Sequence, residues 1–293
     1  MGDGLVFSPS LSQVTPLFKH PLPTLAHAGL VFDRYLPIWE GEAWGHPPQP
    51  KPKRVEELQP RLKEFADAFN KRQKDKRHQD LLSHYHQRWD RLTQPLGLKL
   101  ASFVVQWRLV SGLGAAHPTE NGFSFDAVMG VPYLTGSAIK GVCRQAAKLE
   151  GVDPGEIEQL FGPETVKADE STTGRGALIF YDAFPARWPG LRVEVMNCHH
   201  PDYYGQSEGD QKHALPNPLE NENPVPIFFL AVAEKSEFVF RFACRDGDEA
   251  RLERVEELLE SGLDLLGIGA KTAVGYGAMW SRFRYEEIML DQS

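Results

Sequence analysis

Cysteine is scarce in this sequence. The 293 residues include three cysteines, Cys143, Cys198 and Cys244, which lie far apart and form no CxxC pair. An odd number of isolated cysteines argues against a disulfide framework and fits a reducing compartment. We therefore expect a cytoplasmic protein whose stability does not depend on disulfide bonds.

Long hydrophobic runs are also missing. No stretch approaches the roughly 18 consecutive apolar residues of a bilayer-spanning helix. The first ten residues, MGDGLVFSPS, lack a basic segment followed by an apolar one, so we expect no signal peptide. Hydrophobic residues make up 41% of the chain and charged residues 25%, which is typical of a globular protein with a substantial core. The sequence predicts no membrane partner.

Positive charge is low overall but concentrated in one segment. The net charge is −8, which by itself argues against a general nucleic-acid-binding protein. Between Lys51 and Arg91, however, there are 12 Lys and Arg against 7 Asp and Glu, so this segment carries +5 and the rest of the chain −13. Such a segment is either a basic surface that meets a polyanion or an ordinary solvated helix surface. Charge alone leaves both readings open.

The residue pattern changes near residue 97. Residues 1–54 are rich in Pro and predict an extended, loop-rich arm instead of a packed element. Apolar residues then recur at helical spacing up to Leu92. The stretch Lys71–Arg77 between them is polar on all sides and indicates either a break or a solvated bridge. We predict two parts: residues 1–97 form a Pro-rich arm with a basic helical extension, and residues 98–293 form one domain with a long inserted loop near 197–224.

Strand and helix patterns alternate after residue 97. Strands are predicted over 98–114, 175–185, 191–197 and 277–288, with a hairpin over 225–245 that turns at 234–236. Helices are predicted from Ser137, as N-cap, to Gly151 and over 246–267. This order predicts an α+β fold of the ferredoxin-like or RRM-like (βαββαβ) class with insertions. Both helices should then cover one face of an antiparallel sheet.

A glycine-rich stretch, GIGAKTAVGYG at 267–277, follows the last predicted helix. Its glycines would let backbone N–H groups approach a phosphate, and Lys271 adds a positive charge. It is not a Walker A motif or a dinucleotide fingerprint, because Ala270 separates Gly269 from Lys271 and the loop follows a helix instead of a strand. The loop alone leaves two readings open: contact with an RNA backbone, or a tight turn whose glycines only supply positive φ.

The stretch NCHHPDYY, residues 197–204, is a second candidate. His199 and His200 could ligate a metal or act as acid and base on RNA, because histidine titrates near neutral pH. Adjacent histidines rarely reach one ion together and no spaced second pair of ligands is present, so we expect no metal. Ser137 lacks the GxSxG context of a nucleophile, and we expect no catalytic role for it.

RNA recognition through the backbone is the remaining possibility. The aromatic RNP1 pattern of an RRM is absent, so base stacking on the sheet is not predicted. A helix N-terminus can bind phosphate without reading sequence. A basic stripe, Lys140, Arg144 and Lys148, follows the predicted helix start at Ser137. The predicted topology can bring this helix near the glycine-rich loop.

Five stretches in register resemble the RAMP superfamily of CRISPR systems: VPYLTGSAIKGVCR, GALIFYDAFP, VMNCHHPDYYG, PIFFLAVAEKSEFVFRF and LLGIGAKTAVGYG. They cover roughly residues 98–285 and look most like the sixth-subunit family of the type III-B (Cmr) RNA-guided effector complex. The resemblance implies a non-catalytic subunit without a cofactor that grips guide crRNA and caps the filament toward the crRNA 3′ end, in antiviral defence. Its partners would be crRNA, target RNA, other Cmr RAMP subunits and small helical subunits.

The resemblance also implies RNA-binding residues. The family's helix entry falls on Thr135, Gly136, Ser137 and Lys140, beside Arg144 of the basic stripe, and its loop falls on Gly267, Gly269, Lys271, Thr272, Gly275, Tyr276 and Gly277. Asn197, His199 and His200 are possible loop contacts, although relatives tend to have Asn-Pro-His-Tyr there. The alternative on the same fold is a metal-independent endoribonuclease that processes CRISPR RNA, with His199 or His200 as catalyst.

Overall fold

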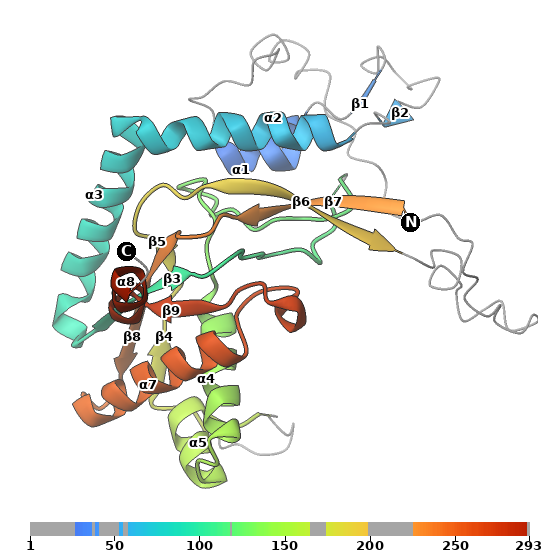
Figure 1. Cartoon of the computed structure of the whole chain (residues 1–293). Helices are drawn as coiled ribbons and strands as arrows, with labels where there is room; N and C mark the ends of the chain where they lie inside the picture. Colours follow the sequence, from blue (N-terminus) through green and yellow to red (C-terminus); the bar gives the residue numbers. More distant parts are fainter. Residues whose placement is uncertain are drawn as a thin grey trace, which may run out of the picture.

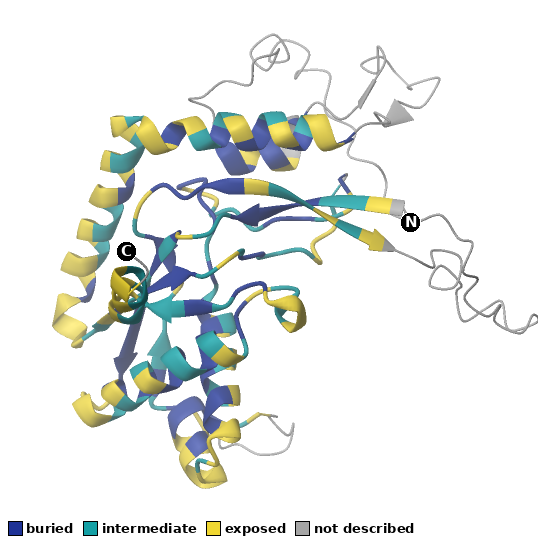
Figure 2. Ribbon diagram, in the orientation of Figure 1, coloured by how far each residue is buried: buried dark blue, intermediate teal, exposed yellow. Residues whose placement is uncertain are grey.

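The computed structural model describes residues 27–36, 39–40, 53–54, 58–117, 119–164, 174–198 and 225–291. Figure 1 shows a central antiparallel sheet with helices packed beneath it and a long two-stranded ribbon that lies under a helix above. Buried residues run continuously from that upper helix through the strands to the lower helices (Figure 2). Among the described helices, none combines the length and the apolar character needed to cross a bilayer.

The central sheet has the spatial order β4 (Leu178–Phe180), β8 (Glu237–Cys244), β3 (Lys99–Val105) and β9 (Met279–Ser281), and each neighbouring pair is antiparallel. A short strand, β5 (Phe184–Pro185), also pairs with β8. Alternate residues of β3 and β8 point to one face, as the period of a strand requires. On that face Phe103 and Phe240 are fully buried, with ring centroids 5.0 Å apart.

Two helices, α4 (Gly136–Leu149) and α7 (Glu249–Leu265), pack against each other and cover this sheet from below (Figure 1). Gly262 permits the close approach, because a Cβ there would lie 2.9 Å from Val142 Cγ1 and 3.1 Å from Ala146 Cβ. The two predicted helices are therefore confirmed. Their packing places the end of α4 beside the first half of α7, where Arg254 donates to Glu150 at 2.9 Å.

The N-cap of α4 differs from the prediction. Thr135, not Ser137, accepts the N–H of Ala138, at 3.3 Å, and Ser137 is the second residue of the helix. Thr135 has the extended backbone that an N-cap needs, and its hydroxyl can reach the third residue after it. Gly151, with φ +74°, follows the last turn as predicted.

The upper layer is formed by α2 (Leu58–Asn70) and the ribbon of β6 (Leu191–Cys198) and β7 (Val225–Val232) (Figure 1). Asn70 joins them, since its amide donates to Leu191 O at 3.0 Å and accepts the Leu191 N–H at 2.7 Å. Of the two readings of the polar stretch, the break is confirmed: the short turn η4 (Lys71–Lys74) ends α2, and α3 (Lys76–Thr93) begins after its N-cap, Asp75.

Part of the Pro-rich arm is packed, which corrects the expectation of an extended arm. In α1 (Ala28–Leu30) and η3 (Val31–Tyr35), Ala28, Val31 and Phe32 are buried in the core. Phe32 stacks on His117 with ring centroids 4.2 Å apart, and His117 Nε2 donates to Phe32 O at 3.0 Å. The Pro-rich composition concealed a short apolar cluster, AGLVF. The strands β1 (Trp39–Glu40) and β2 (Lys53–Arg54) pair with each other.

The predicted division at residue 97 stays a prediction, but the core does not stop there. Leu62, Phe69 and Leu82 belong to the same hydrophobic cluster as Leu191 and Phe240. The extension therefore shares its buried surface with the sheet domain. The inserted loop 199–224 lies outside the described residues.

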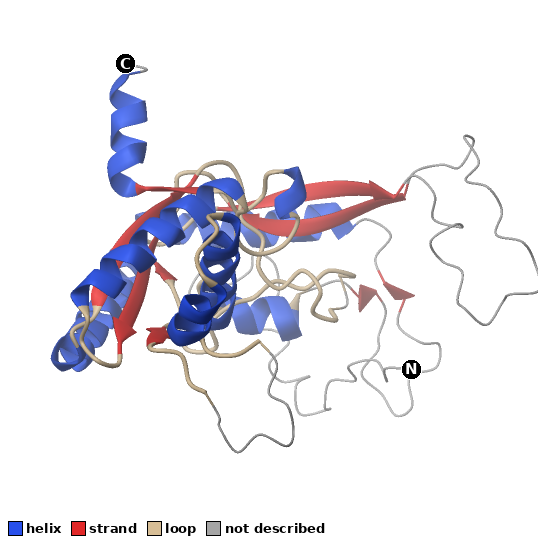
Figure 3. Cartoon of the chain, turned by 90° about the horizontal axis from the view of Figure 1, so that it is seen from below, coloured by secondary structure: helices blue, strands red, loops and turns tan. Residues whose placement is uncertain are grey.

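Three predicted strands differ from the structure in their extent. β3 ends at Val105 and is followed by an irregular segment that includes a single bridge between Leu109 and Val232. The strand predicted at 175–185 is divided into β4 and β5. The closing strand is limited to β9, and the chain continues as α8 (Arg282–Asp291), where Arg282 bonds Glu286 one turn later at 2.9 Å. Figure 3 shows α8 projecting from the body.

The predicted hairpin over 225–245 is wrong in its pairing. β7 pairs with β6 in the ribbon, whereas β8 pairs with β3 and β4 in the central sheet. The connection bends at Lys235, which has φ +64° and whose N–H donates to Val105 O at 2.9 Å. Turn residues mark where a chain bends, but pairing depends on partners distant in sequence. β7 and β8 are consecutive in the chain but belong to different sheets.

Candidate nucleic-acid interface

The glycine-rich loop connects α7 to β9 and folds tightly on its neighbours. Its four glycines, at 267, 269, 275 and 277, have φ values between +70° and +96°. A Cβ at Gly277 would lie 1.9 Å from Ile268 O, and one at Gly269 would lie 2.2 Å from Val110 O. No larger residue fits at these two positions without moving backbone. The loop therefore meets the geometric demands of a tight turn.

Many of the loop's backbone N–H groups are already used. The amide of Gly277 donates to Arg108 O at 2.6 Å, and the amide of Ala270 donates to Val110 O at 2.8 Å. An amide that donates inside the protein is not available to a phosphate. A phosphate at this loop would therefore be bound mainly by side chains and not by backbone amides. The amides that donate to protein carbonyls include Gly267, Ile268, Ala270, Gly275, Tyr276 and Gly277.

Lys271 carries the positive charge of the loop. Its backbone is left-handed, with φ +60°, and its Nζ lies 5.5 Å from the centroid of the buried Phe229 ring on β7. That distance fits a cation–π contact, which orients the ammonium group without neutralising it. Lys271 forms no ion pair with a carboxylate in the described parts of the chain. Beyond it, the tip formed by Ala273, Val274 and Gly275 is exposed.

A charged network lies beside the loop. Arg108, in the segment after β3, donates to Glu194 of β6 at 2.7 Å and also to Glu234. Arg192 bonds the other oxygen of Glu234 at 3.3 Å. Burial would raise the pKa of Glu234, but its own backbone amide, Arg108 and Arg192 outweigh burial and lower it. Glu234 is therefore charged at neutral pH.

Aromatic side chains complete this surface. Tyr276 donates to Glu194 at 3.4 Å, and its ring centroid lies 4.9 Å from that of Trp107. We call the surface formed by Trp107, Arg108, Glu194, Lys271 and Tyr276 the glycine-loop face. The sequence predicted an RNA contact for Lys271 and Tyr276, but it did not indicate that Trp107 and Arg108 lie on the same face. No signal in the sequence marked these two residues, because they lie inside the strand predicted over 98–114.

The predicted helix entry already has an acidic partner. The Gly136 N–H donates to Asp182 Oδ1 at 2.7 Å, and a Cβ at Gly136 would lie 2.4 Å from Phe180 O. Ser137 is exposed, with its hydroxyl 3.0 Å from that of Thr135. A phosphate at this helix end would have to compete with Asp182 for the first amide.

The basic stripe of α4 is divided among different roles. Arg144 donates to Phe161 O at 2.8 Å and to Gly162 O at 2.6 Å, so it caps the end of α5 (Pro154–Phe161). Lys148 pairs with Glu164. Lys140 is half-buried, and burial together with Arg144 and Arg245 lowers its pKa. Of the three, Lys140 is the one that forms no ion pair among the described residues.

The helix entry and the glycine-rich loop have separate neighbours. Gly136 contacts Phe180 and Asp182 near β4, whereas the loop contacts Arg108 and Val110. No hydrogen bond or ion pair joins the two groups in the part of the chain that the structure describes. The two elements therefore do not form one hydrogen-bonded site.

The contacts predicted near residue 197 are only partly visible. Asn197 pairs with Pro226 in the ribbon. Because side chains alternate along a strand, Asn197 lies on the opposite face of β6 from Glu194, which faces Arg108. Asn197 therefore does not belong to the glycine-loop face. His199 and His200 lie outside the described residues.

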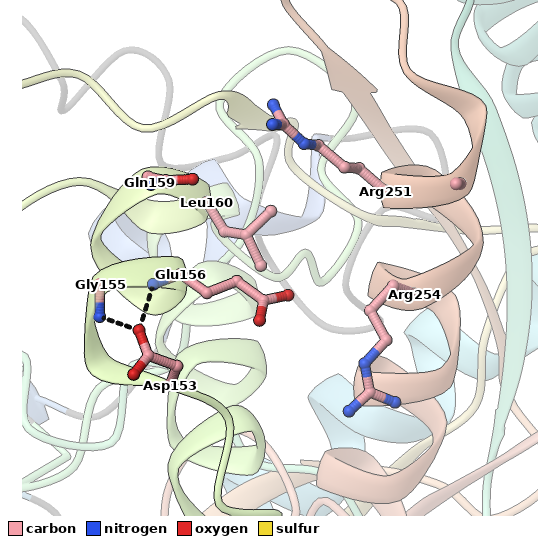
Figure 4. Close-up of a pocket in the computed structure, with 8 residues that line it drawn as sticks. Asp153, Gly155, Glu156, Gln159, Leu160, Arg251 and Arg254 are labelled. Atoms are coloured by element: carbon pink, nitrogen blue, oxygen red, sulfur yellow. Dashed lines mark hydrogen bonds between the residues drawn. The ribbon is translucent and has the colours of Figure 1, made fainter.

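A pocket of about 580 Å³ lies between α5 and the start of α7 (Figure 4). Arg251 and Arg254 reach into it from α7, but Arg251 pairs with Asp246 and Arg254 pairs with Glu150. It is separated from the glycine-rich loop by most of α7, about 20 Å of helix. Within the described ranges, no three His, Cys, Asp or Glu side chains converge to hold a metal.

Comparison with known proteins identifies the class. Residues 40–280 match the sequence model of the RAMP superfamily, and the chain belongs to that superfamily. It is 29% identical over 254 residues to the CRISPR system Cmr subunit Cmr6 of Pyrococcus furiosus, which covers 68% of this chain and 73% of that protein. It is 29% identical over 161 residues to Cmr6 of Saccharolobus solfataricus, covering 54% of this chain and 47% of that relative. The predicted resemblance is confirmed.

The fold is also found in a solved structure. A chain of the cryo-EM structure of type III-B Cmr-beta bound to cognate target RNA has a TM-score of 0.54 to this chain at 23% identity. The similarity covers 70% of this chain and 66% of that chain. At this identity the comparison concerns the fold alone.

Proposed function

We propose that this chain is a non-catalytic subunit of a type III-B Cmr ribonucleoprotein. It binds the backbone of guide crRNA and caps the subunit filament toward the crRNA 3′ end, with target RNA, other Cmr RAMP subunits and small helical subunits as partners in the cytoplasm. The family match over residues 40–280, joined to the similarity with two Cmr6 proteins, carries the proposal.

The order of elements supports a ferredoxin-like core for this subunit. Along the chain, β3, α4, β4, β8, α7 and β9 give the order βαββαβ, with β5, β6 and β7 inserted between the second and third core strands. Both helices pack together on one side of the sheet, as this fold requires. The inserted ribbon then becomes a platform for the glycine-rich loop.

The charges favour particular residues for the RNA contact. Lys271 and Lys140 form no ion pair among the described residues, whereas Arg144 and Lys148 already have partners. A cation without a carboxylate partner can neutralise a phosphate at the least cost. We therefore assign the RNA backbone first to Lys271 and then to Lys140, with the hydroxyls of Ser137 and Thr272 as additional donors.

The direct test is binding of crRNA to the reconstituted complex at several salt concentrations. The variant Lys271→Ala plus Lys140→Ala should bind more weakly, and the slope of log affinity against log salt should fall by about 0.7 to 0.9 for each lost phosphate contact. Lys148→Ala is the matched control, because Lys148 lies on the same helix as Lys140 and is already paired with Glu164. Equal binding by the wild type and the double variant would contradict the assignment.

The absence of catalysis needs its own assay. The purified full-length chain should leave precursor CRISPR RNA intact in the presence of a chelator. Discrete cleavage that is lost in His199→Ala would overturn the non-catalytic assignment and favour an endoribonuclease with a histidine base.

A further inference from the structure

Trp107 has no role in the backbone contacts proposed above. Its surface is 47% exposed, although Val105 and Leu109 on either side of it in the chain are buried. Large aromatic residues usually lose most of their surface in a folded chain. Here the indole contacts Tyr276 of the glycine-rich loop, and about half of its surface is open to solvent.

The exposed indole is firmly supported. Its ring centroid lies 4.9 Å from that of Tyr276, and the guanidinium carbon of Arg108 lies 5.7 Å from the ring. Tyr276 is itself buried against Phe229, with centroids 6.0 Å apart. Trp107 is therefore the exposed end of a row of aromatic contacts whose other members belong to the core.

The backbone on both sides of Trp107 is tied to the glycine-rich loop. The Gln106 N–H donates to Ala278 O at 3.0 Å, and Arg108 O accepts the Gly277 N–H at 2.6 Å. The side chain of Gln106 also donates to Asp264 at 2.9 Å. A side chain that is already ordered loses little entropy when a ligand stacks on it. Trp107 can therefore stack on a planar ligand at a low entropic cost.

The charges nearby favour a nucleotide as that partner. Arg108 and Arg192 bind the two carboxylates of the network, so their charges are compensated by Glu194 and Glu234. Lys235 is exposed in the turn that bonds to Val105, and Lys271 lies at the other end of the aromatic row. A ligand with a flat aromatic face and negative charge on its backbone matches this arrangement.

We infer that Trp107 is a stacking platform for one unpaired base of RNA, adjacent to the phosphate contact at Lys271. The inference rests on the proposed function and adds a base contact to its backbone contacts. Stacking on an aromatic ring tolerates every base, because each base has a π face. Trp107 would therefore hold the RNA in register without reading its sequence, and Arg108 acts as a positioning residue for the indole.

The experiment measures RNA binding by the assembled complex with Trp107, Trp107→Ala or Trp107→Phe. Trp107→Ala should weaken binding by about 5- to 100-fold, and Trp107→Phe should keep most of the affinity. Phe283→Ala is the matched control, because Phe283 is 71% exposed on α8. A second readout uses RNAs with a single abasic site moved along the strand. One position should weaken binding to the wild type and have no effect on Trp107→Ala.

The outcomes separate this inference from the proposed function. The stacking inference fails, while the backbone contact stands, if Lys271→Ala weakens RNA binding but Trp107→Ala does not. In that case no abasic position would distinguish the wild type from Trp107→Ala. If the wild type binds no RNA, both fail. If Trp107→Ala loses a protein subunit from the complex but binds RNA as before, Trp107 belongs to a protein interface and the inference is wrong. The abasic scan on wild type does not depend on how the variant folds.

Discussion

Arg241 of β8 donates to Asp90 of α3 from Nη2 at 2.9 Å and from Nε at 3.3 Å. Arg241 is 3% exposed, while the side chain of Asp90 is 49% exposed. The neighbours of Arg241 in the strand, Phe240 and Phe242, point to the face covered by α4 and α7, so Arg241 points to the other face. An arginine keeps its charge when it is buried and requires a partner. The pair therefore anchors α3 on the second face of the sheet.

We predict that Asp90→Ala lowers the free energy of unfolding by about 2 kcal/mol, because it leaves the Arg241 guanidinium without its carboxylate. Urea unfolding of the full chain measures this loss. Asp80→Ala, at an exposed position of the same helix, should change stability by less than about 0.5 kcal/mol. In Asp90→Ala with Arg241→Met, part of the loss should be recovered. A single variant as stable as the wild type would show that the pair does not anchor α3.

His86 should make the folded chain sensitive to mildly acidic pH. His86 Nε2 donates to Pro185 O at 2.9 Å, and Nδ1 accepts from Arg241 at 3.0 Å. Burial, together with the charge of Arg241, lowers the pKa of His86. The unfolded chain takes up this proton near pH 6.5, whereas the folded chain does so only at lower pH. The free energy of unfolding should therefore fall as the pH drops below about 6.5 toward the lowered pKa.

Thermal unfolding at pH 7.5, 6.5 and 5.5 measures this effect. The decline should be shallower in His86→Gln than in the wild type. Some decline should remain, because burial also lowers the pKa of His78 and His117. His84→Gln is the control, since His84 is exposed on the same helix and should leave the decline unchanged. Parallel curves for His86→Gln and the wild type would exclude His86 as the source.

Gly277→Ala should cost about 3 kcal/mol or more, because φ is +76° and the new Cβ would meet Ile268 O at 1.9 Å. Gly141→Ala is the opposite case, since Gly141 lies in α4 with open space around its Cα. That change should stabilise the chain by up to about 1 kcal/mol. Calorimetric unfolding of both variants measures the contrast. If the two variants had equal stability, the backbone conformation of the loop would not require glycine at position 277.

Phe32→Ala should destabilise the chain by about 3 to 4 kcal/mol, because it removes a fully buried ring that stacks on His117. Leu30→Ala should cost much less, since Leu30 is 48% exposed in the same segment. Denaturant unfolding with an unchanged m-value would assign the difference to stability. A small effect of Phe32→Ala would show that residues 28–36 contribute little to the core and form a peripheral arm.

Much of the helical part of the fold could be predicted, because helix signals are local. The apolar spacing that predicts α2, the spacing that predicts α7 and the polar stretch that separates α2 from α3 are each contained in a short stretch of sequence. The strands were less predictable, since β7 and β8 look like a hairpin until their partners are known. The residues proposed to contact RNA divide in the same way. The sequence of the loop alone pointed to Lys271, whereas Trp107 is recognisable only by its exposure in the folded chain.

By itself the sequence determined the superfamily, the two core helices and the tight loop at 267–277. These depend on motif order and on backbone preferences that each short stretch carries alone. Tertiary structure decided which cations are compensated, because Arg144 caps α5 and Arg108 binds Glu194 through contacts distant in sequence. It also decided that the ribbon of β6 and β7 supports the glycine-rich loop. Pairing and burial depend on the whole fold, so no local pattern encodes them.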